Sequence, residues 1–397
     1  MTALILQHVP LKDRLASARV CKTWAEAAAL ATSSIKRSAL SGAKLPGLQS
    51  WLQQHGRHLT SLELSVHAAR NTVLQLPDLR QLRSLELACC QLQLQSVAHR
   101  QRTRSAARSP VVLLPHLTAL ELGCFVLSTP STLLQLTRVT TLRSLKLDGI
   151  EITAKLQQRP KQLSHALSAV LQCNTQLTQL HVSGLVLEDA ALGALSSLQQ
   201  LQECWVGVCD GRVQGSWRAC EGAGSTSANL LSGLPPSLTS LSIDEGRPSF
   251  DGTMTHVTLP RQLLQLTRLQ QVMLDKARFC PSALASMTQL QQLHLDTCSW
   301  VGDAAAGAAA GDQLSQGVAA LLAAVGQMLQ LESLYVEGLW QGASLNSPDV
   351  PVQSYSALTA STCLQRLSLS VADAGPLPLG AVWGCMDTAF MAIERGV

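Results

Sequence analysis

The side chains best suited to chemistry in this sequence lie between the two apolar residues of short Leu-x-Leu or Leu-x-Val strings. Glu63, Glu86 and Glu121 take this place in three strings, and His181 and His294 take it in two others. Neighbouring carboxylates repel one another unless a cation approaches, and two histidines can share a metal ion or act as a catalytic pair. What these residues can do therefore depends on how closely the fold places them.

The strings belong to a longer pattern, Leu-x-x-Leu-x-Leu, which recurs eleven times between residues 59 and 369 with apolar replacements at some positions. Several copies continue upstream with an apolar residue at every third position, which suits a 3₁₀ turn leading into a strand. The final Leu-x-Leu has the alternation of a strand. Cys90, Cys209 and Cys298 stand where leucine-rich repeats carry Asn or Cys. In these features the sequence resembles the leucine-rich-repeat family.

This resemblance implies an α/β leucine-rich-repeat solenoid, with a parallel sheet on the concave side and helices or 3₁₀ turns on the convex side. We expect it to fill residues 46–370 and to be followed by a cap or tail at 371–397. Insertions are expected near 99–112, 209–235 and 299–318. Helical apolar patterns in two long intervals predict convex-side helices at KQLSHALSAVLQCNTQL (161–177) and VAALLAAVGQML (318–329).

The repeat spacing argues against catalysis and metal binding. His181 and His294 lie four coils apart, which is about 19 Å at ~4.8 Å per coil, so they cannot share a metal ion or act as a pair. The twelve cysteines include no C-x-x-C pair, and no zinc-protease, serine-hydrolase or phosphate-loop motif is found. We therefore predict a protein that is not an enzyme and that needs no cofactor or metal.

The N-terminus has a different pattern. Residues 5–24 read ILQHVPLKDRLASARVCKTW, where Pro10 ends a first apolar segment and Asp13 helps to start a helix. The string resembles an F-box at Ile5, Leu6, Val9, Pro10, Leu11, Lys12, Asp13, Leu15, Val20, Cys21, Lys22 and Trp24. The family usually opens with a Leu-Pro pair, which MTAL replaces here, so the first helix is expected to be shortened. We predict a small all-α F-box-like module over residues 1–45, with Trp24 packed between two short helices.

The F-box resemblance implies a partner. F-box proteins bind a Skp-type adaptor in a cullin complex and thereby act as substrate receptors of a ubiquitin ligase, raising the effective concentration of substrate near the ubiquitin-charged enzyme. The adaptor-binding residues that the resemblance implies are Pro10, Leu11, Leu15, Val20, Cys21 and Trp24. The alternative is an ordinary helical cap that covers the first repeat.

The x residues of the strings should point away from the core and line the concave face. They include nine acids against one Lys and one Arg, so we predict that this face binds a partner protein through a basic segment, with aromatic side chains as anchors. The alternative is a solvated face kept charged for solubility. The predicted partner-binding residues are Glu63, Glu86, Glu121, Asp148, His181, Trp205, Asp275, Asp296, Tyr335 and Glu337.

Composition sets the remaining expectations. The net charge of +4 is too small to indicate a nucleic-acid partner, and the longest apolar run, at 318–329, is too short to span a bilayer. We expect a soluble cytoplasmic protein that is monomeric outside its complex, with a nuclear, cytoskeletal or ciliary location as alternatives. The predicted function is the substrate receptor of a Skp–cullin–F-box ligase, and the alternative is a non-enzymatic repeat scaffold with an inactive F-box remnant.

Overall fold

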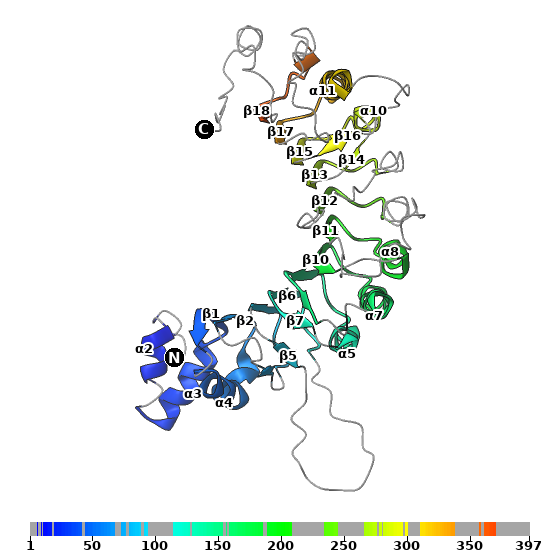
Figure 1. Cartoon of the computed structure of the whole chain (residues 1–397). Helices are drawn as coiled ribbons and strands as arrows, with labels where there is room; N and C mark the ends of the chain where they lie inside the picture. Colours follow the sequence, from blue (N-terminus) through cyan, green and yellow to red (C-terminus); the bar gives the residue numbers. More distant parts are fainter. Residues whose placement is uncertain are drawn as a thin grey trace. The chain divides into compact units, whose positions relative to one another are not determined.

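The computed structural model (Figure 1) describes residues 6–93, 114–208, 234–244, 266–300, 310–337 and 357–370. Inside these ranges it leaves out residues 7–8, 10, 18–19, 42–43, 68–72, 77–78, 89–90, 128, 154–155, 157–158, 186–188, 276–277, 280, 297 and 359–360. The predicted insertion at 99–112, most of that at 209–235, and the tail at 371–397 lie outside the described residues. The chain forms two compact units, Met1–Gly184 and Leu185–Val397.

The first unit begins with two helices and continues as a parallel sheet. Helices α2 (Leu11–Ser17) and α3 (Lys22–Ala31) come first, and α4 (Leu45–His55) with the 3₁₀ turn η2 (Gly56–His58) follows the first strand. The strands of the main sheet are, in order, β1 (Ser34–Ser41), β2 (Ser61–His67), β4 (Ser84–Ala88), β6 (Ala119–Gly123), β8 (Ser144–Asp148) and β10 (Gln179–Leu185). Two short parallel pairs accompany it: β3 (Val73–Gln75) with β5 (Gln91–Gln93), and β7 (Val126–Leu127) with β9 (Glu151–Ile152).

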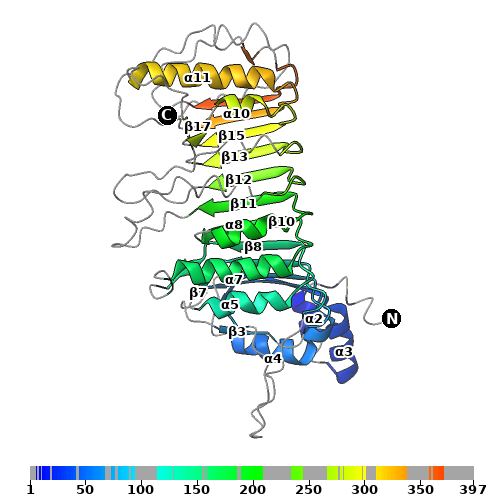
Figure 2. The same ribbon diagram turned by 90° about the vertical axis from the view of Figure 1, so that its right-hand side faces the viewer.

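The helical segments that follow β7 in the first unit lie on one side of its sheet, as Figure 2 shows. They are α5 (Pro130–Leu134), the 3₁₀ turn η3 (Gln135–Arg138) and α7 (Pro160–Cys173). Helix α7 confirms the helical pattern predicted at 161–177, and it buries Leu163, Leu167 and Val170 on one stripe. It ends at Asn174, whose side-chain amide donates a hydrogen bond of 2.9 Å to the Val170 carbonyl.

The second unit repeats this arrangement. Its main strands are β11 (Glu203–Val208), β12 (Ser240–Asp244), β13 (Gln271–Asp275), β15 (Gln292–Asp296), β17 (Ser333–Glu337) and β18 (Arg366–Ser370), all parallel. Its other elements are α8 (Asp189–Leu195), β14 (Arg278–Phe279), α10 (Pro281–Ala285), β16 (Ser299–Trp300) and α11 (Ala310–Gln327). Helix α11 begins before the predicted pattern at residue 318, so the second half of the insertion expected at 299–318 is helical.

The core of each coil is the leucine pattern itself. The leucines of the Leu-x-Leu strings whose side chains the structure describes are buried, and the string positions pair one to one across neighbouring strands, as Leu62 does with Leu85. The upstream spacing of three corresponds to backbone hydrogen bonds from residue i to residue i−3, for example Leu82 N to Leu79 O at 3.1 Å. The buried Cys298, at the position where leucine-rich repeats carry Asn or Cys, directs its thiol to the Leu274 carbonyl at 3.2 Å. These features confirm the predicted leucine-rich-repeat architecture.

Strand β1 was not predicted. It lies inside residues 1–45, the range expected to be helical, and pairs in parallel with β2. Its sequence, SIKRSALS, has no Leu-x-Leu string, and its Ile35 takes the buried place opposite Leu62. The Ser33 carbonyl just before it accepts hydrogen bonds from Thr60 N and Ser61 N, so the sheet begins one strand earlier than the repeat pattern does.

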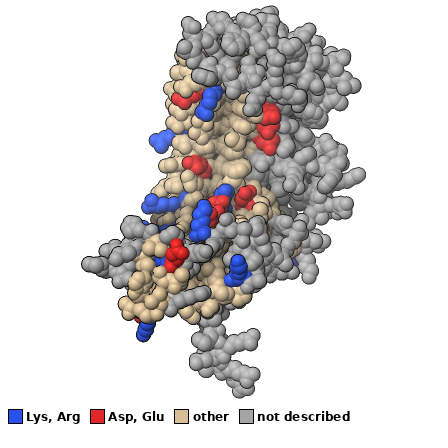
Figure 3. All heavy atoms as spheres, turned by 90° about the vertical axis from the view of Figure 1, so that its left-hand side faces the viewer, with Lys and Arg blue, Asp and Glu red and all other residues tan. Residues whose placement is uncertain are grey.

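The side of the sheet opposite the helices is called the open face here, because the x residues of the strings lie on it. Figure 3 looks onto this face and shows acidic and basic side chains next to one another on parts of it. No helix among the described residues combines the length and apolarity that crossing a membrane requires.

Candidate functional site

A small apolar core holds the N-terminal module together. Leu6 packs with Ala27, Ala28 and Ala31 of α3, and Val9 is partly buried against them. Alanine side chains are short, so the helix can lie close to Leu6 without a large side chain between them. Trp24 was expected to pack between two helices, but 39% of its surface is exposed.

Arg14 of α2 joins the two ends of this module, a role that the sequence did not reveal. Its Nη1 donates to the Ala31 carbonyl at the end of α3, and its Nη2 donates to the Val9 carbonyl, both at 2.8 Å. A guanidinium is a rigid fork of donors, which suits it to bridge two carbonyls, and a cation is favourable at the end of a helix. Arg14 therefore fixes α2 and the residues before it against α3.

The predicted adaptor-binding residues divide into three groups. Val20, Cys21 and Trp24 are exposed, Val20 by 70%. Val20 and Cys21 directly precede α3, and Trp24 lies in its first turn; we call these three residues the α3 patch. Leu11 and Leu15 lie in α2, and Pro10 is outside the described residues. The exposed α3 patch is thus distinct from the module's apolar core, which is formed by Leu6 and the alanines of α3.

On the open face of the first unit, acids and lysines occupy one row across the strands. The row runs in register through Lys36, Glu63, Glu86, Glu121, Lys146 and His181. Lys36 Nζ lies 2.6 Å from Glu63 Oε1, and Lys146 Nζ lies 2.7 Å from Glu121 Oε1. Lysines of the chain itself therefore pair with two of the three glutamates that stand in successive Leu-x-Leu strings. The position of Lys36 on this face was not predicted, because β1 carries no Leu-x-Leu string.

Glu86 lies between the two ion-paired glutamates. Its partial burial and the carboxylates of Glu121 and Glu63 raise its pKa, and Lys36 and Lys146 oppose this shift. The row thus carries three acids and two lysines, and the excess charge belongs to the middle carboxylate.

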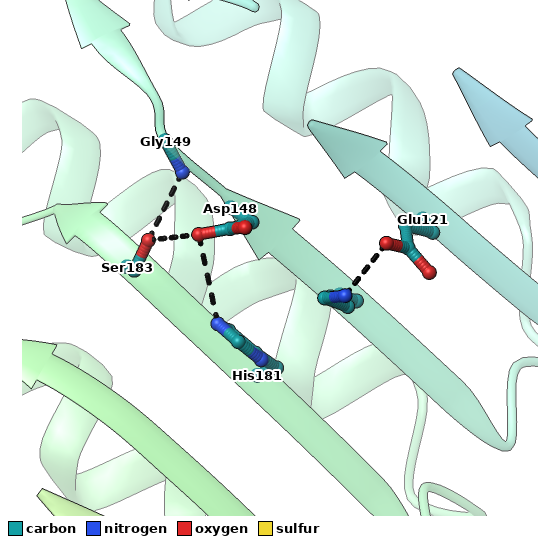
Figure 4. A network of polar contacts seen from close by, with 6 residues as sticks. Glu121, Asp148, Gly149, His181 and Ser183 are labelled. Atoms are coloured by element: carbon teal, nitrogen blue, oxygen red, sulfur yellow. Dashed lines mark hydrogen bonds and ion pairs between the residues drawn. The ribbon is translucent and has the colours of Figure 1, made fainter. Parts of the chain in front are cut away.

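Beside this row, a polar network joins β8 to β10 (Figure 4). Ser183 Oγ donates to Asp148 Oδ1 at 2.6 Å and accepts from the Gly149 amide at 3.0 Å. His181 Nε2 lies 3.7 Å from the same Asp148 oxygen. No pattern in the sequence marks Ser183, as none marks Arg14, because the hydrogen-bond partners of Ser183 come from the neighbouring strand and the residue that follows it.

His181 was predicted to lie on the exposed face, but the structure buries it, with 9% of its surface exposed. Burial lowers its pKa to about 4, although Asp148 acts in the opposite direction. The imidazole is therefore neutral at pH 7 and is too weak a base to activate Ser183, whose hydroxyl proton is directed at Asp148. The network stabilises the two strands and does not form a nucleophile–base pair.

The open face of the second unit is different. Trp205, Met273, His294 and Tyr335 lie on one register line across β11, β13, β15 and β17, with the small Ser242 of β12 between the first two. Trp205 is 36% exposed and Met273 is 46% exposed. The His294 and Tyr335 rings are in contact, with centroids 4.2 Å apart, and the Tyr335 hydroxyl donates to Glu337. We call these four residues the aromatic row.

A second line of predicted residues runs beside the aromatic row. Asp275, Asp296 and Glu337 pair with one another in register, each two residues after a member of the aromatic row and therefore on the same face. We call these three residues the acidic row. Among the described residues, no group of His, Cys, Asp and Glu has the arrangement of a metal site. The buried Cys204 thiol of β11, whose pKa burial raises to about 12, belongs to the core.

Comparison with known proteins identifies the N-terminal module. Residues 2–30 match the F-box domain. This module is an F-box. The exposed α3 patch and the Arg14 bridge are therefore features of an F-box that precedes leucine-rich repeats.

Two solved structures are similar to this chain at low sequence identity and low TM-score. An internalin from Listeria monocytogenes is 15% identical, with a TM-score of 0.43 over 89% of this chain and 95% of that one. The plant peptide hormone receptor RGFR1 in complex with RGF2 is 17% identical, with a TM-score of 0.37 over 78% of this chain and 43% of that one. Among curated protein sequences, none matches this chain.

Proposed function

We propose that this protein is the substrate-recognition subunit of a Skp–cullin–F-box ubiquitin ligase. The observation that carries the proposal is the F-box at residues 2–30, where Val20, Cys21 and Trp24 are exposed at the start of α3, outside the module's own core. An exposed cluster of this kind is the usual form of an interface anchor. The repeats would then hold the substrate, and the chain would perform no chemistry itself. We also propose a cytoplasmic location, where such a receptor would meet its adaptor.

The adaptor test is co-purification of the full chain with a Skp-type adaptor, comparing wild type with a Val20→Ala/Trp24→Ala variant. We expect wild type to capture the adaptor and the double variant to capture at least about tenfold less, because exposed aromatic anchors contribute most to such interfaces. Leu134→Ala is the matched control, since Leu134 is also an exposed apolar side chain of the first unit. Circular dichroism confirms that each variant is folded.

Two outcomes would contradict the proposal in different ways. A folded double variant that captures the adaptor as well as wild type would remove the α3 patch from the interface. A wild-type chain that captures no adaptor would exclude the ligase role and leave a repeat scaffold with an inactive F-box.

A further inference from the structure

The open faces of the two units differ in how their acidic side chains are placed. In the first unit, Glu63 and Glu121 already form ion pairs with Lys36 and Lys146. In the second unit, the register neighbours of Asp296 are Asp275 on one side and Glu337 on the other. The second unit thus places three carboxylates next to one another, whereas the first unit places lysines beside its glutamates, and adjacent carboxylates favour the approach of a cation.

Exposed apolar side chains lie beside the acids of the second unit, but they are absent from the charged row of the first unit that runs from Lys36 to His181. The acidic row lies about 6.6 Å along the strands from the aromatic row, which is the distance of two residues. Trp205 and Met273 are both more than one-third exposed, and aromatic and methionine side chains are enriched where proteins bind one another. The row of the first unit contains only charged residues and the buried His181.

We propose that the substrate docks on the open face of the second unit, along the aromatic row, and that it is a protein segment with apolar side chains flanked by Lys or Arg. This inference rests on the receptor function proposed above. The apolar side chains would contact Trp205, Met273 and Tyr335, and the cations would lie over the acidic row. From β11 to β17 the row crosses four strand spacings, about 19 Å, which is the length of about six residues of extended chain.

The first unit is the poorer site for the same segment. A basic side chain that approached Glu63 or Glu121 would have to displace a lysine of the chain itself, and would gain little because one cation replaces another. Glu86 is the remaining glutamate of this row, and the neighbouring Lys36 and Lys146 already act to lower its pKa, so cations of the chain itself act on it too. The acids that stand out most in the sequence are thus not the ones that we expect to bind the partner.

The test measures binding of fluorescent synthetic peptides to the full chain by anisotropy. Three peptides of about twelve residues share one arrangement of two residue types. The first combines Leu with Lys, the second replaces each Lys by Glu, and the third replaces each Leu by Gln. We expect the Leu/Lys peptide to bind tightest. Trp205→Ala and Met273→Ala should each weaken it by about tenfold, as loss of a central anchor does. Asp275→Asn/Asp296→Asn should weaken it comparably at low salt, and the difference should nearly vanish near 1 M salt, where the Debye length is about 3 Å.

The matched control is Glu63→Gln/Glu121→Gln, which removes two carboxylates from the other unit and should leave peptide binding unchanged. The proposal is overturned if this control weakens binding as much as Asp275→Asn/Asp296→Asn, or if the Gln/Lys or Leu/Glu peptide binds as tightly as the Leu/Lys peptide. It is also overturned if gel filtration shows a dimer that Trp205→Ala and Met273→Ala each dissociate, because the occupant is then a second copy of the chain. Circular dichroism checks the fold of every variant.

Failure of this inference can be told apart from failure of the receptor function. Adaptor capture is measured on the same preparations, and the peptide assay contains no adaptor. Peptide binding without adaptor capture removes the ligase role and keeps the docking surface. Adaptor capture without selective peptide binding keeps the ligase role and removes the docking surface.

Discussion

Arg14 shows at the scale of a single residue how the F-box is held together. Its guanidinium donates to the carbonyls of Val9 and Ala31, which lie at opposite ends of the module. Replacing it by methionine keeps the length of the side chain and removes both bonds. We expect Arg14→Met to lower the free energy of unfolding of this module by about 2–3 kcal/mol, the usual effect of losing hydrogen bonds to a charged group.

Hydrogen exchange of the α3 amides measures this loss, because the module can open locally without unfolding the repeats. Arg268→Met, at an exposed arginine of the second unit, is the control and should leave α3 exchange unchanged. Wild-type protection of α3 in Arg14→Met would show that the alanine core alone holds the helix.

His181 makes the first unit sensitive to pH. Burial lowers its pKa from 6.5 to about 4 in the folded protein, so the unfolded chain binds the proton first as the pH falls. The stabilisation by the neutral imidazole is complete above pH 6.5 and decreases as the pH falls toward 4, by up to about 3 kcal/mol. His181→Gln should lose correspondingly less stability over this window.

Urea unfolding at pH 7.5 and at pH 4.5 checks the pH prediction. Asp148, Lys146 and Glu121 also face the imidazole, and they are present in both wild type and variant, so the comparison isolates His181. His116→Gln changes an exposed histidine of the same unit and should behave as wild type. Parallel losses of stability in wild type and His181→Gln would disprove the prediction.

At the scale of elements, the sequence predicts what repeats and misses what does not. The leucine strings predicted the eleven strands that follow β1 in the main sheet, because burial and register both follow from a repeated pattern, but they did not predict the short side pairs β3–β5, β7–β9 and β14–β16. Strand β1 was missed because its sequence, SIKRSALS, contains no Leu-x-Leu string. Lys36 lies on β1 and was missed for the same reason, so its ion pair with Glu63 was not predicted. Arg14 and the burial of His181 depend on contacts between elements, which no local pattern encodes.

Strand β1 leads to a prediction about the start of the sheet. It covers the edge of β2 and buries Ile35 against the first coil, so it should stabilise the repeats independently of the F-box. Removing residues 1–32 leaves β1 and the Ser33 carbonyl in place, whereas removing residues 1–41 uncovers β2. We expect the longer deletion to lower the Tm of the repeats by at least about 5 °C relative to the shorter one. Equal melting temperatures for the two deletions would show that β1 adds nothing to the repeat core.

At the scale of the whole molecule, the two surfaces proposed here belong to different compact units. The α3 patch lies in Met1–Gly184, and the aromatic and acidic rows lie in Leu185–Val397. In an array of repeats each coil contacts its neighbours, so a surface substitution in one unit has no direct effect on the side chains of a distant coil. We therefore expect the free energy of adaptor binding not to depend on bound substrate, and the reverse. A receptor that joins one adaptor to different substrates requires this independence.

A double-mutant cycle tests this independence. One variant is Val20→Ala/Trp24→Ala, the other is Asp275→Asn/Asp296→Asn, and the third combines them. Adaptor capture should depend only on the first pair of substitutions and Leu/Lys peptide binding only on the second. The coupling free energy should stay within about 0.5 kcal/mol, as it does for distant sites with no shared partner. A larger coupling, together with unchanged circular dichroism, would mean that occupancy of one surface alters the other, and the protein would then be a regulated receptor in which the adaptor controls when the substrate binds.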